Sequence, residues 1–156
     1  MNKRYPLVLA FVALLSAGNA AADPFSGFYL GPEIAYDNGP VDFDQFTFGG
    51  IAGFNLPLSE NVYIGLEGEA SGSTFDNIDF IFGGHAQIGY RVLPTVAVFA
   101  RAGYREFDFT FGFEGGDATY GVGGQVFLTD SLAVRGIVDT LDFDTVGFRA
   151  ALVFEF

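Results

Sequence analysis

The segment IDFIFGGHAQIGYR, residues 78–91, alternates between two kinds of side chain. Its even-numbered positions hold only apolar residues or glycine, whereas its odd-numbered positions include Asp79, His85, Gln87 and Arg91. Successive side chains of a β-strand point to opposite faces of a sheet. This period of two therefore predicts a strand with one apolar face and one polar face.

Seven further segments show the same alternation, and in each of them the apolar set falls on even numbers. Each is close to the roughly ten residues that a tilted strand needs to cross a membrane. The shared parity predicts an all-β fold, an eight-stranded antiparallel barrel with one continuous apolar face. The predicted strands are residues 26–36, 45–56, 62–72, 78–91, 95–105, 118–128, 132–141 and 145–156.

Residues 1–22 are predicted to be a signal peptide, which leaves 23–156 as the barrel. Two basic residues precede a short apolar run at 7–15, and small residues follow it. This order is typical of a secretory signal and is too short for a membrane helix. Cleavage is expected after Ala22, with Ala20 as the alternative.

Composition excludes several classes of function. Beyond the predicted cleavage site five arginines stand against 19 acidic residues, a net charge of −14. Such a chain lacks the basic footprint of a nucleic-acid-binding protein. It has no cysteine, so disulfides, thiol catalysis and zinc–thiolate sites are excluded. We expect no catalytic residue, cofactor or metal.

Alternation alone is compatible with two folds, since a soluble barrel or sandwich turns its apolar face inward and a membrane barrel turns it toward lipid. Three features favour the membrane barrel. The signal peptide exports the chain, and the odd face carries all five arginines but no lysine, as suits a crowded interior of paired guanidiniums. Tyrosine and phenylalanine also lie near the segment ends, where membrane barrels form aromatic girdles.

The connections between the segments are predicted to alternate in length, with short periplasmic turns and longer, acidic outer loops. The aromatic residues also change parity after Tyr104, to the odd positions Phe107, Phe109, Phe111 and Phe113. Either the membrane portion ends near Arg105 and a hairpin projects above it, or a bulge resets the strand. The predicted turns are 56–61, 92–94 and 129–131, and the predicted loops are 37–44, 73–77, 106–117 and 142–144.

Four stretches, FSGFYLGPEIAY (25–36), NVYIGLEGEASG (61–72), GYRVLPTVAVFARAGY (89–104) and VGFRAALVFEF (146–156), carry a resemblance. They are similar to small outer-membrane β-barrel proteins of the OmpA/OmpX type, including opacity-protein-like surface antigens of Gram-negative bacteria. The resemblance implies residence in the outer membrane, in contact with its lipid and lipopolysaccharide. It also implies that the barrel assembly machinery reads the last strand, through Phe148, Leu152, Phe154 and Phe156.

The odd face predicts a network of charges in the lumen. Isolated charges in so narrow a space are costly, so these groups should pair. The expected members are Glu33, Glu67, Glu69, His85, Arg101, Arg105, Arg135, Asp139 and Arg149. The expected pairs are Glu33 with Arg149, near Asp139, and Glu67 and Glu69 with Arg101 or Arg105.

His85, the one histidine, is expected to face the lumen and to be satisfied by a carboxylate. Ser71 lies inward on the adjacent strand and is expected to pair close to Asp79, several residues from His85. Because nucleophilic catalysis needs both groups within hydrogen-bond reach, the sequence favours a structural histidine.

The predicted function is that of a non-enzymatic, monomeric outer-membrane surface protein, structural or adhesive, with a plugged lumen. A narrow porin-like channel for small solutes or cations is the alternative, and a lipid-modifying enzyme is the third candidate. The Asp-Phe alternations at 41–48, 73–82, 105–117 and 141–145 fall at the predicted outer tips. They indicate a cation-bridged contact with lipopolysaccharide, a partner-binding surface, or a solvated negative rim.

Overall fold

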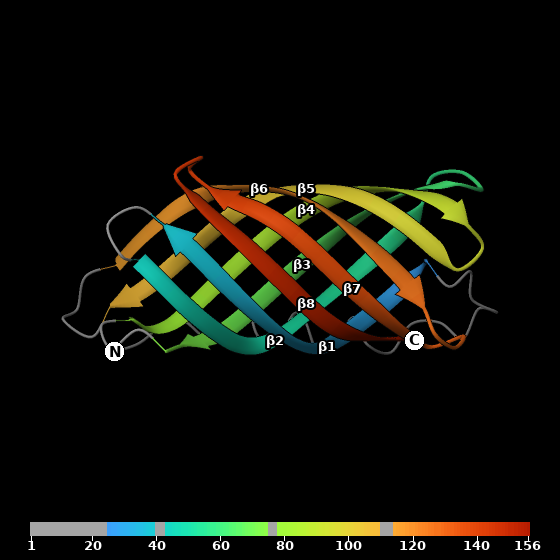
Figure 1. Ribbon diagram of the computed structural model, residues 1–156. Coiled ribbons are helices and arrows are strands. Elements are labelled where there is room, and N and C mark those ends of the chain that lie inside the picture. Colours follow the sequence, from blue (N-terminus) through green and yellow to red (C-terminus); the bar gives the residue numbers. More distant parts are fainter. Residues whose placement is uncertain (1–24, 40–42, 75–77, 110–113) are drawn as a thin grey trace, which may run out of the picture.

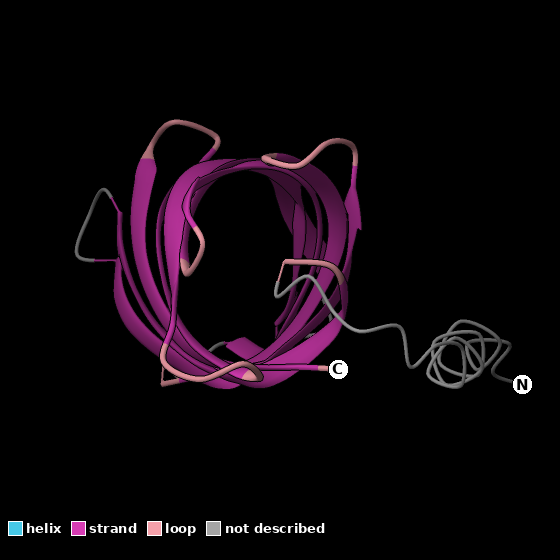
Figure 2. Cartoon of the chain, turned by 90° about the vertical axis from the view of Figure 1, so that its right-hand side faces the viewer, coloured by secondary structure: helices cyan, strands magenta, loops and turns pink. Residues whose placement is uncertain are grey.

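The computed structural model of the protein describes residues 25–39, 43–74, 78–109 and 114–156. These residues form eight antiparallel strands in one closed barrel, which confirms the predicted fold class (Figure 1). Each strand pairs with its sequence neighbour, and β8 pairs with β1 to close the ring that Figure 2 shows end on. The expected signal peptide lies outside the described residues. The strands are β1 (Gly27–Gly39), β2 (Phe43–Pro57), β3 (Val62–Ser73), β4 (Ile78–Leu93), β5 (Val96–Phe109), β6 (Glu114–Phe127), β7 (Leu132–Leu141) and β8 (Thr145–Glu155).

Side chains alternate between the inside and the outside of the barrel by residue number. In β8 every odd position is buried and every even position is exposed. The same parity places Ile34, Ile88 and Val122 on the outer surface, each more than half exposed. The apolar face that the sequence predicts to meet lipid is therefore the outer wall. Among the described residues there is also no helix long and apolar enough to span a bilayer.

One end of the lumen is filled by aromatic and aliphatic side chains. Phe25 packs against Tyr63, with ring centroids 6.0 Å apart, and edge-on against Phe127 at 4.9 Å. Tyr29 and Phe99 belong to the same buried cluster. Phe25 directly precedes β1. This aromatic plug therefore lies at the end of the barrel where β1 begins and β8 ends. Above it, the odd positions become polar.

The two ends of the barrel differ less in loop length than the sequence predicts. Residues 58–61, 94–95 and 128–131 connect strands at the end where β1 begins (Figure 1). At the other end, strand pairing continues into the predicted loops, so only three or four residues separate the strands there. The prediction of longer outer loops is wrong in that form, because the backbone hydrogen bonds extend the hairpins instead. Because the segments predicted as outer loops continue here as paired strands, we assign this end to the extracellular side and the other end to the periplasm.

The hairpin of β5 and β6 resolves the change in aromatic parity. Pairing runs unbroken from Arg105 opposite Asp117 to Asp108 opposite Glu114, so the predicted bulge on this strand is wrong. A register shift lies in the neighbouring strand β4 instead, at residue 79. Glu106 and Asp108 consequently point outward and are exposed, while Phe107 is buried. Outward carboxylates are costly in lipid, so the membrane portion ends below Glu106 and the hairpin projects above it. Residues 111 and 113 lie outside the described residues.

Ala100 lies on the exposed face of β5, close to the middle of the barrel wall. We expect Ala100→Arg to lower the free energy of unfolding by about 2–4 kcal/mol, because it places a guanidinium in hydrocarbon. Denaturant unfolding in lipid vesicles measures this, with Ser59→Arg in an exposed turn as the control. Equal stability of the two variants would contradict a lipid-facing outer wall.

Candidate functional site

Four arginines lie inside the barrel above the aromatic plug. Arg101 and Arg105 come from β5, Arg135 from β7 and Arg149 from β8, and each is at most 5% exposed. A guanidinium remains charged under all ordinary conditions, so burial is tolerable only beside carboxylates. Each of the four has at least one carboxylate partner.

Glu67 on β3 binds two of these arginines at once. Arg101 Nη1 lies 2.8 Å from its Oε1, and Arg135 Nη1 lies 2.7 Å from its Oε2. The hydroxyl of Tyr29 also donates to Oε2, at 2.8 Å. This hydroxyl reaches Glu67 because its ring crosses Gly53, where a Cβ atom would lie 2.3 Å from the phenol. Glu67 thus ties β3 to β1, β5 and β7 across the lumen.

Asp139 on β7 is the second hub, since a single carboxylate oxygen faces three guanidiniums. Its Oδ2 accepts hydrogen bonds from Arg101 Nη2, from Arg149 Nε at 2.8 Å and from Arg105 Nη2 at 3.4 Å. Charge-assisted hydrogen bonds of this kind are about twice as strong as neutral ones. Removal of this one carboxylate would leave three cations facing each other.

The network continues toward the extracellular end. Arg105 Nε donates to Glu69 Oε1 at 2.5 Å. Arg149 lies 2.9 Å from Asp37 Oδ1 and 3.5 Å from Glu33 Oε1. Both acids are on β1, so Arg149 on β8 holds together the two strands that close the barrel.

Toward the plug, Arg135 makes the transition from the charged to the aromatic part of the lumen. It donates to Gln87 Oε1 at 2.5 Å, and its guanidinium carbon lies 4.1 Å from the ring centroid of Phe99. Gln87 also donates to Asn55 Oδ1 at 2.8 Å. A cation over a ring face in a desolvated site contributes about 2 kcal/mol. Arg135 therefore contacts both the polar and the aromatic side chains that fill the lumen.

The structure places every predicted member of the network in the lumen, and all are buried. The predicted pairs are present: Glu33 contacts Arg149, Glu67 forms an ion pair with Arg101, and Glu69 forms one with Arg105. Sequence analysis missed both Asp37, which it assigned to a loop, and Tyr29, which it did not include in the network. The odd parity of these two positions is the signal that could have identified them.

His85 departs from the prediction. It is 3% exposed and lies opposite Glu67 in the ladder, but neither ring nitrogen has a hydrogen-bond partner among the described protein atoms. The expected carboxylate partner is therefore wrong. The physical reason is competition, because the oxygens of Glu67 and Glu69 are occupied by arginines. The imidazole packs instead against Gly103, where a Cβ atom would lie 2.7 Å from its Cδ2.

A catalytic pair of His85 and Ser71 finds no support in the geometry. Ser71 pairs with Ile81, two residues from the predicted Asp79, and four residues separate it from Glu67, which pairs with His85. At about 3.3 Å per residue this separation exceeds hydrogen-bond reach several times over. Within the described part of the chain there is also no group of three or more acidic or histidine side chains arranged to hold a metal.

The four predicted residues of the assembly signal share one face of the terminal strand region. All are outward-facing and exposed, so they form an apolar stripe beside β1 and β7. The stripe consists of Phe148, Leu152, Phe154 and Phe156.

A family model described as "Outer membrane protein beta-barrel domain" matches residues 7–154. No curated protein matches the chain. Among solved structures, the attachment invasion locus protein Ail of Yersinia pestis has 15% identity and a TM-score of 0.55, over 83% of this chain and 96% of its own. The N-terminal β-barrel domain of Pseudomonas aeruginosa OprF has 14% identity and a TM-score of 0.56, over 84% and 99%. Neisserial surface protein A has 13% identity and a TM-score of 0.54, over 84% and 98%. At these identities the structures establish the fold alone.

Asp139→Asn tests the second hub. We expect it to lower the free energy of unfolding by about 3–5 kcal/mol, because three buried guanidiniums lose a shared anion. Adding Arg101→Gln should restore part of the loss. Urea unfolding of the refolded barrel measures both effects, with Asp142→Asn in the exposed β7–β8 turn as the matched control. A loss no larger than that of the control would show that Asp139 does not hold the network together.

Proposed function

The chain belongs to the outer membrane protein beta-barrel domain family and resides in the bacterial outer membrane, and on that premise we propose that it is a non-enzymatic surface protein. In this proposal the barrel is a rigid anchor with a plugged lumen, and its projecting extracellular edge is adhesive. The observation that carries the proposal is the cross-lumen network centred on Glu67 and Asp139.

The plug argues against conduction. Eight strands enclose an interior just wide enough for side chains to fill it. Here Glu67 links strands on opposite walls, and the Phe25 cluster lies below it. A solute would have to break several buried ion pairs to pass. A narrow channel is thus less well supported than a closed anchor.

The extracellular edge offers a surface for contact. Along its outward face, Glu106 pairs with Phe82, and Asp108 pairs with Phe80. We call these four residues the acidic–aromatic ledge. Both phenylalanines are more than half exposed, and their rings stack with centroids 6.2 Å apart. The ledge therefore combines negative charge with exposed aromatic area, a combination suited to binding a cationic polypeptide.

The negative charge of the ledge does not suit the kind of ligand with which one structurally similar protein was solved. Ail was also solved in complex with the heparin analogue sucrose octasulfate, a polyanion. Glu106 and Asp108 would repel such a ligand, and Asp117 lies on the neighbouring strand of the same hairpin. We therefore propose a positively charged partner for this chain, bound through charge and aromatic contact together.

Conductance tests the plug. In planar bilayers the wild-type protein should show no steady large conductance. Glu67→Ala should produce flickering current and lower the unfolding temperature, since Arg101 and Arg135 lose a shared anion. Glu60→Ala in an exposed turn is the matched control. A stable, porin-sized current through the wild type would refute the plug and favour the channel.

Cell adhesion tests the ledge. Cells that display the protein should bind poly-arginine-coated beads, and the double variant Glu106→Gln/Asp108→Asn should reduce binding by about tenfold, the scale of two partly exposed charge contacts. Binding should also fall with added salt. Asp130→Asn, in a turn at the periplasmic end, is the control. Binding that neither the double variant nor salt reduces would overturn the adhesive role of the ledge.

A further inference from the structure

The barrel closes where β8 pairs with β1, and we call this strand pair the seam (Figure 1). The ladder of the seam is interrupted. Pairing with β8 stops after Leu30 and resumes at Glu33 in the same register. Gly31 and Pro32, which lie between them, are not paired with β8, although both are paired with β2.

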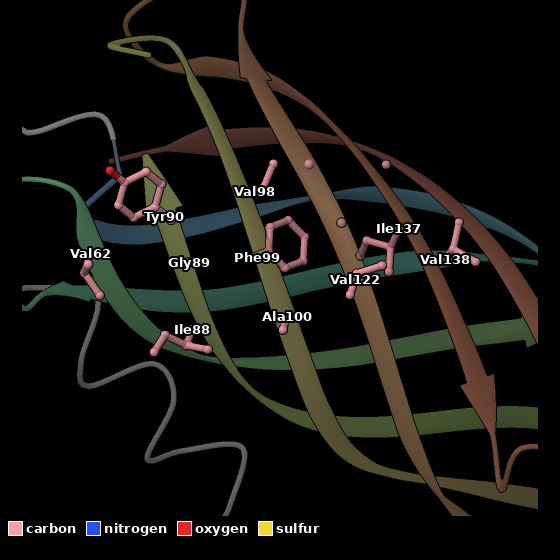
Figure 3. A pocket seen from close by; sticks show the side chains of 13 residues that line it. Val62, Ile88, Gly89, Tyr90, Val98, Phe99, Ala100, Val122, Ile137 and Val138 are labelled. Atoms are coloured by element: carbon pink, nitrogen blue, oxygen red, sulfur yellow. The ribbon is translucent and has the colours of Figure 1, made fainter. Parts of the chain in front are cut away.

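The other seven strand pairs show no such gap among the described residues. β4 and β5 shift register only near the two ends of their pairing, at residues 79 and 92. Around the apolar pocket of the outer wall that Figure 3 shows, Ala100 pairs with Val122, and Val122 pairs with Val138. The interruption is therefore particular to the seam.

Pro32 explains the interruption, because its backbone nitrogen faces β8 and carries no hydrogen. The N–H of Phe156 donates to the carbonyl of Phe28 at 2.8 Å, so Phe28 directs its backbone groups toward β8. In an antiparallel pair every second residue faces the same neighbour, and Pro32 consequently faces β8 as well. The register places it opposite Leu152, whose carbonyl cannot receive a hydrogen bond from a proline.

The two backbones come close together at this gap. A Cβ atom at Gly31 would overlap the carbonyl oxygen of Leu152, so no larger residue fits beside the proline. On the lumen side, Arg149 of β8 forms ion pairs with Glu33 and Asp37 of β1. These ion pairs connect the two strands next to the incomplete part of the ladder.

A missing ladder bond is costly at this place in the closed barrel. Pro32 is the sixth of the 13 residues of β1, and its ring is exposed on the outer wall. In hydrocarbon no water replaces a lost backbone hydrogen bond. Within sheets, proline belongs to edge strands, where its nitrogen faces no neighbour. In the closed barrel β1 has a neighbour on each side, so Pro32 is at a position that suits an edge strand only.

β1 is an edge strand before the barrel closes. Seven strand pairs join neighbours in the sequence, and the seam alone joins the first strand to the last. Because the entropic cost of closing a loop rises with its length, the seam is expected to form last. Until then β1 presents a row of unpaired N–H and C=O groups, which is a template for pairing with another chain.

We propose that Pro32 protects the edge of β1 in the unclosed barrel by preventing a strand of a second copy from completing a ladder on it. The proline removes one donor from the middle of this edge, so any incoming strand meets the same gap as β8. β8 pairs in spite of the gap because its register brings Arg149 to Glu33 and Asp37. A strand that pairs in another register lacks these ion pairs.

Refolding at increasing protein concentration tests this role. The purified, urea-unfolded protein is diluted into detergent micelles, and heat-modifiable monomers are separated from oligomers on gels. Pro32→Val restores the missing donor. We expect its ratio of oligomers to monomers to be about fivefold above that of the wild type, the scale of one backbone hydrogen bond, and to rise with concentration.

Pro57→Val is the matched control. It also removes an exposed proline from a strand, but at the end of β2 and away from the seam. Both variants gain the same conformational freedom in the unfolded chain. Pro57→Val should refold with the oligomer ratio of the wild type.

Two further measurements separate edge protection from a role in the folded barrel. Folded Pro32→Val monomers, concentrated to the same level, should remain monomeric, because the edge no longer exists after closure. They should unfold at the same urea concentration as Pro57→Val or at a higher one. Pro32→Ala replaces Pro32→Val where the latter does not fold.

Several outcomes would overturn the proposal. One is an oligomer ratio equal to that of the wild type at every concentration. Association of folded Pro32→Val monomers would assign the contact to the outer wall instead of the edge. A stability below that of the Pro57→Val control, or failure of both position-32 variants to fold, would show that the proline serves the closed barrel.

Discussion

A guanidinium enclosed by eight strands must face a carboxylate, and this requirement organises the interior of the barrel. The lumen is too narrow for each charge to keep its own hydration, so each of the four arginines in the network pairs with acids from other strands. Glu67 and Asp139 satisfy several cations at once because they lie at the centre of the arrangement. The network also needs space for large side chains to cross the lumen. Inward-facing glycines provide this space, as Gly53 does beneath the ring of Tyr29.

The fold could be predicted from the sequence because a single parity runs through the whole chain. Alternation reports directly which face of a strand a side chain occupies, and eight segments in phase leave little choice but a closed, two-faced sheet. The outer ends of the strands could not be placed in the same way. There the outer face carries exposed carboxylates in place of apolar side chains, so the pattern in 105–117 no longer distinguishes a loop from a projecting hairpin. Only the backbone pairing of Arg105 with Asp117 decides.

The membership of the charged lumen followed from the same parity, and so did the pairs of Glu33, Glu67 and Glu69 with arginines. The sharing of one carboxylate by several arginines, at Glu67 and at Asp139, did not. Which acid meets which arginine depends on the tilt of the strands and on the length of side chains that cross the interior. His85 shows the limit, since its place opposite Glu67 suggested a partner that two arginines had already taken. Asp37 was missed for a different reason, because it lies where a loop was expected and the strand in fact continues.

The network inside also determines the chemistry outside. All five arginines beyond the predicted cleavage site occupy odd positions of the strands, and four of them form ion pairs with carboxylates in the lumen. The fifth, Arg91, lies half-buried at the periplasmic end. The extracellular edge therefore retains its carboxylates without any compensating cation from the described residues. Such an edge repels anionic sugars and attracts basic surfaces, with a strength that salt weakens. In the proposed function, a barrel that neutralises its own interior with its arginines thus leaves acidic groups at the cell surface, where charge and aromatic contact together select a basic partner.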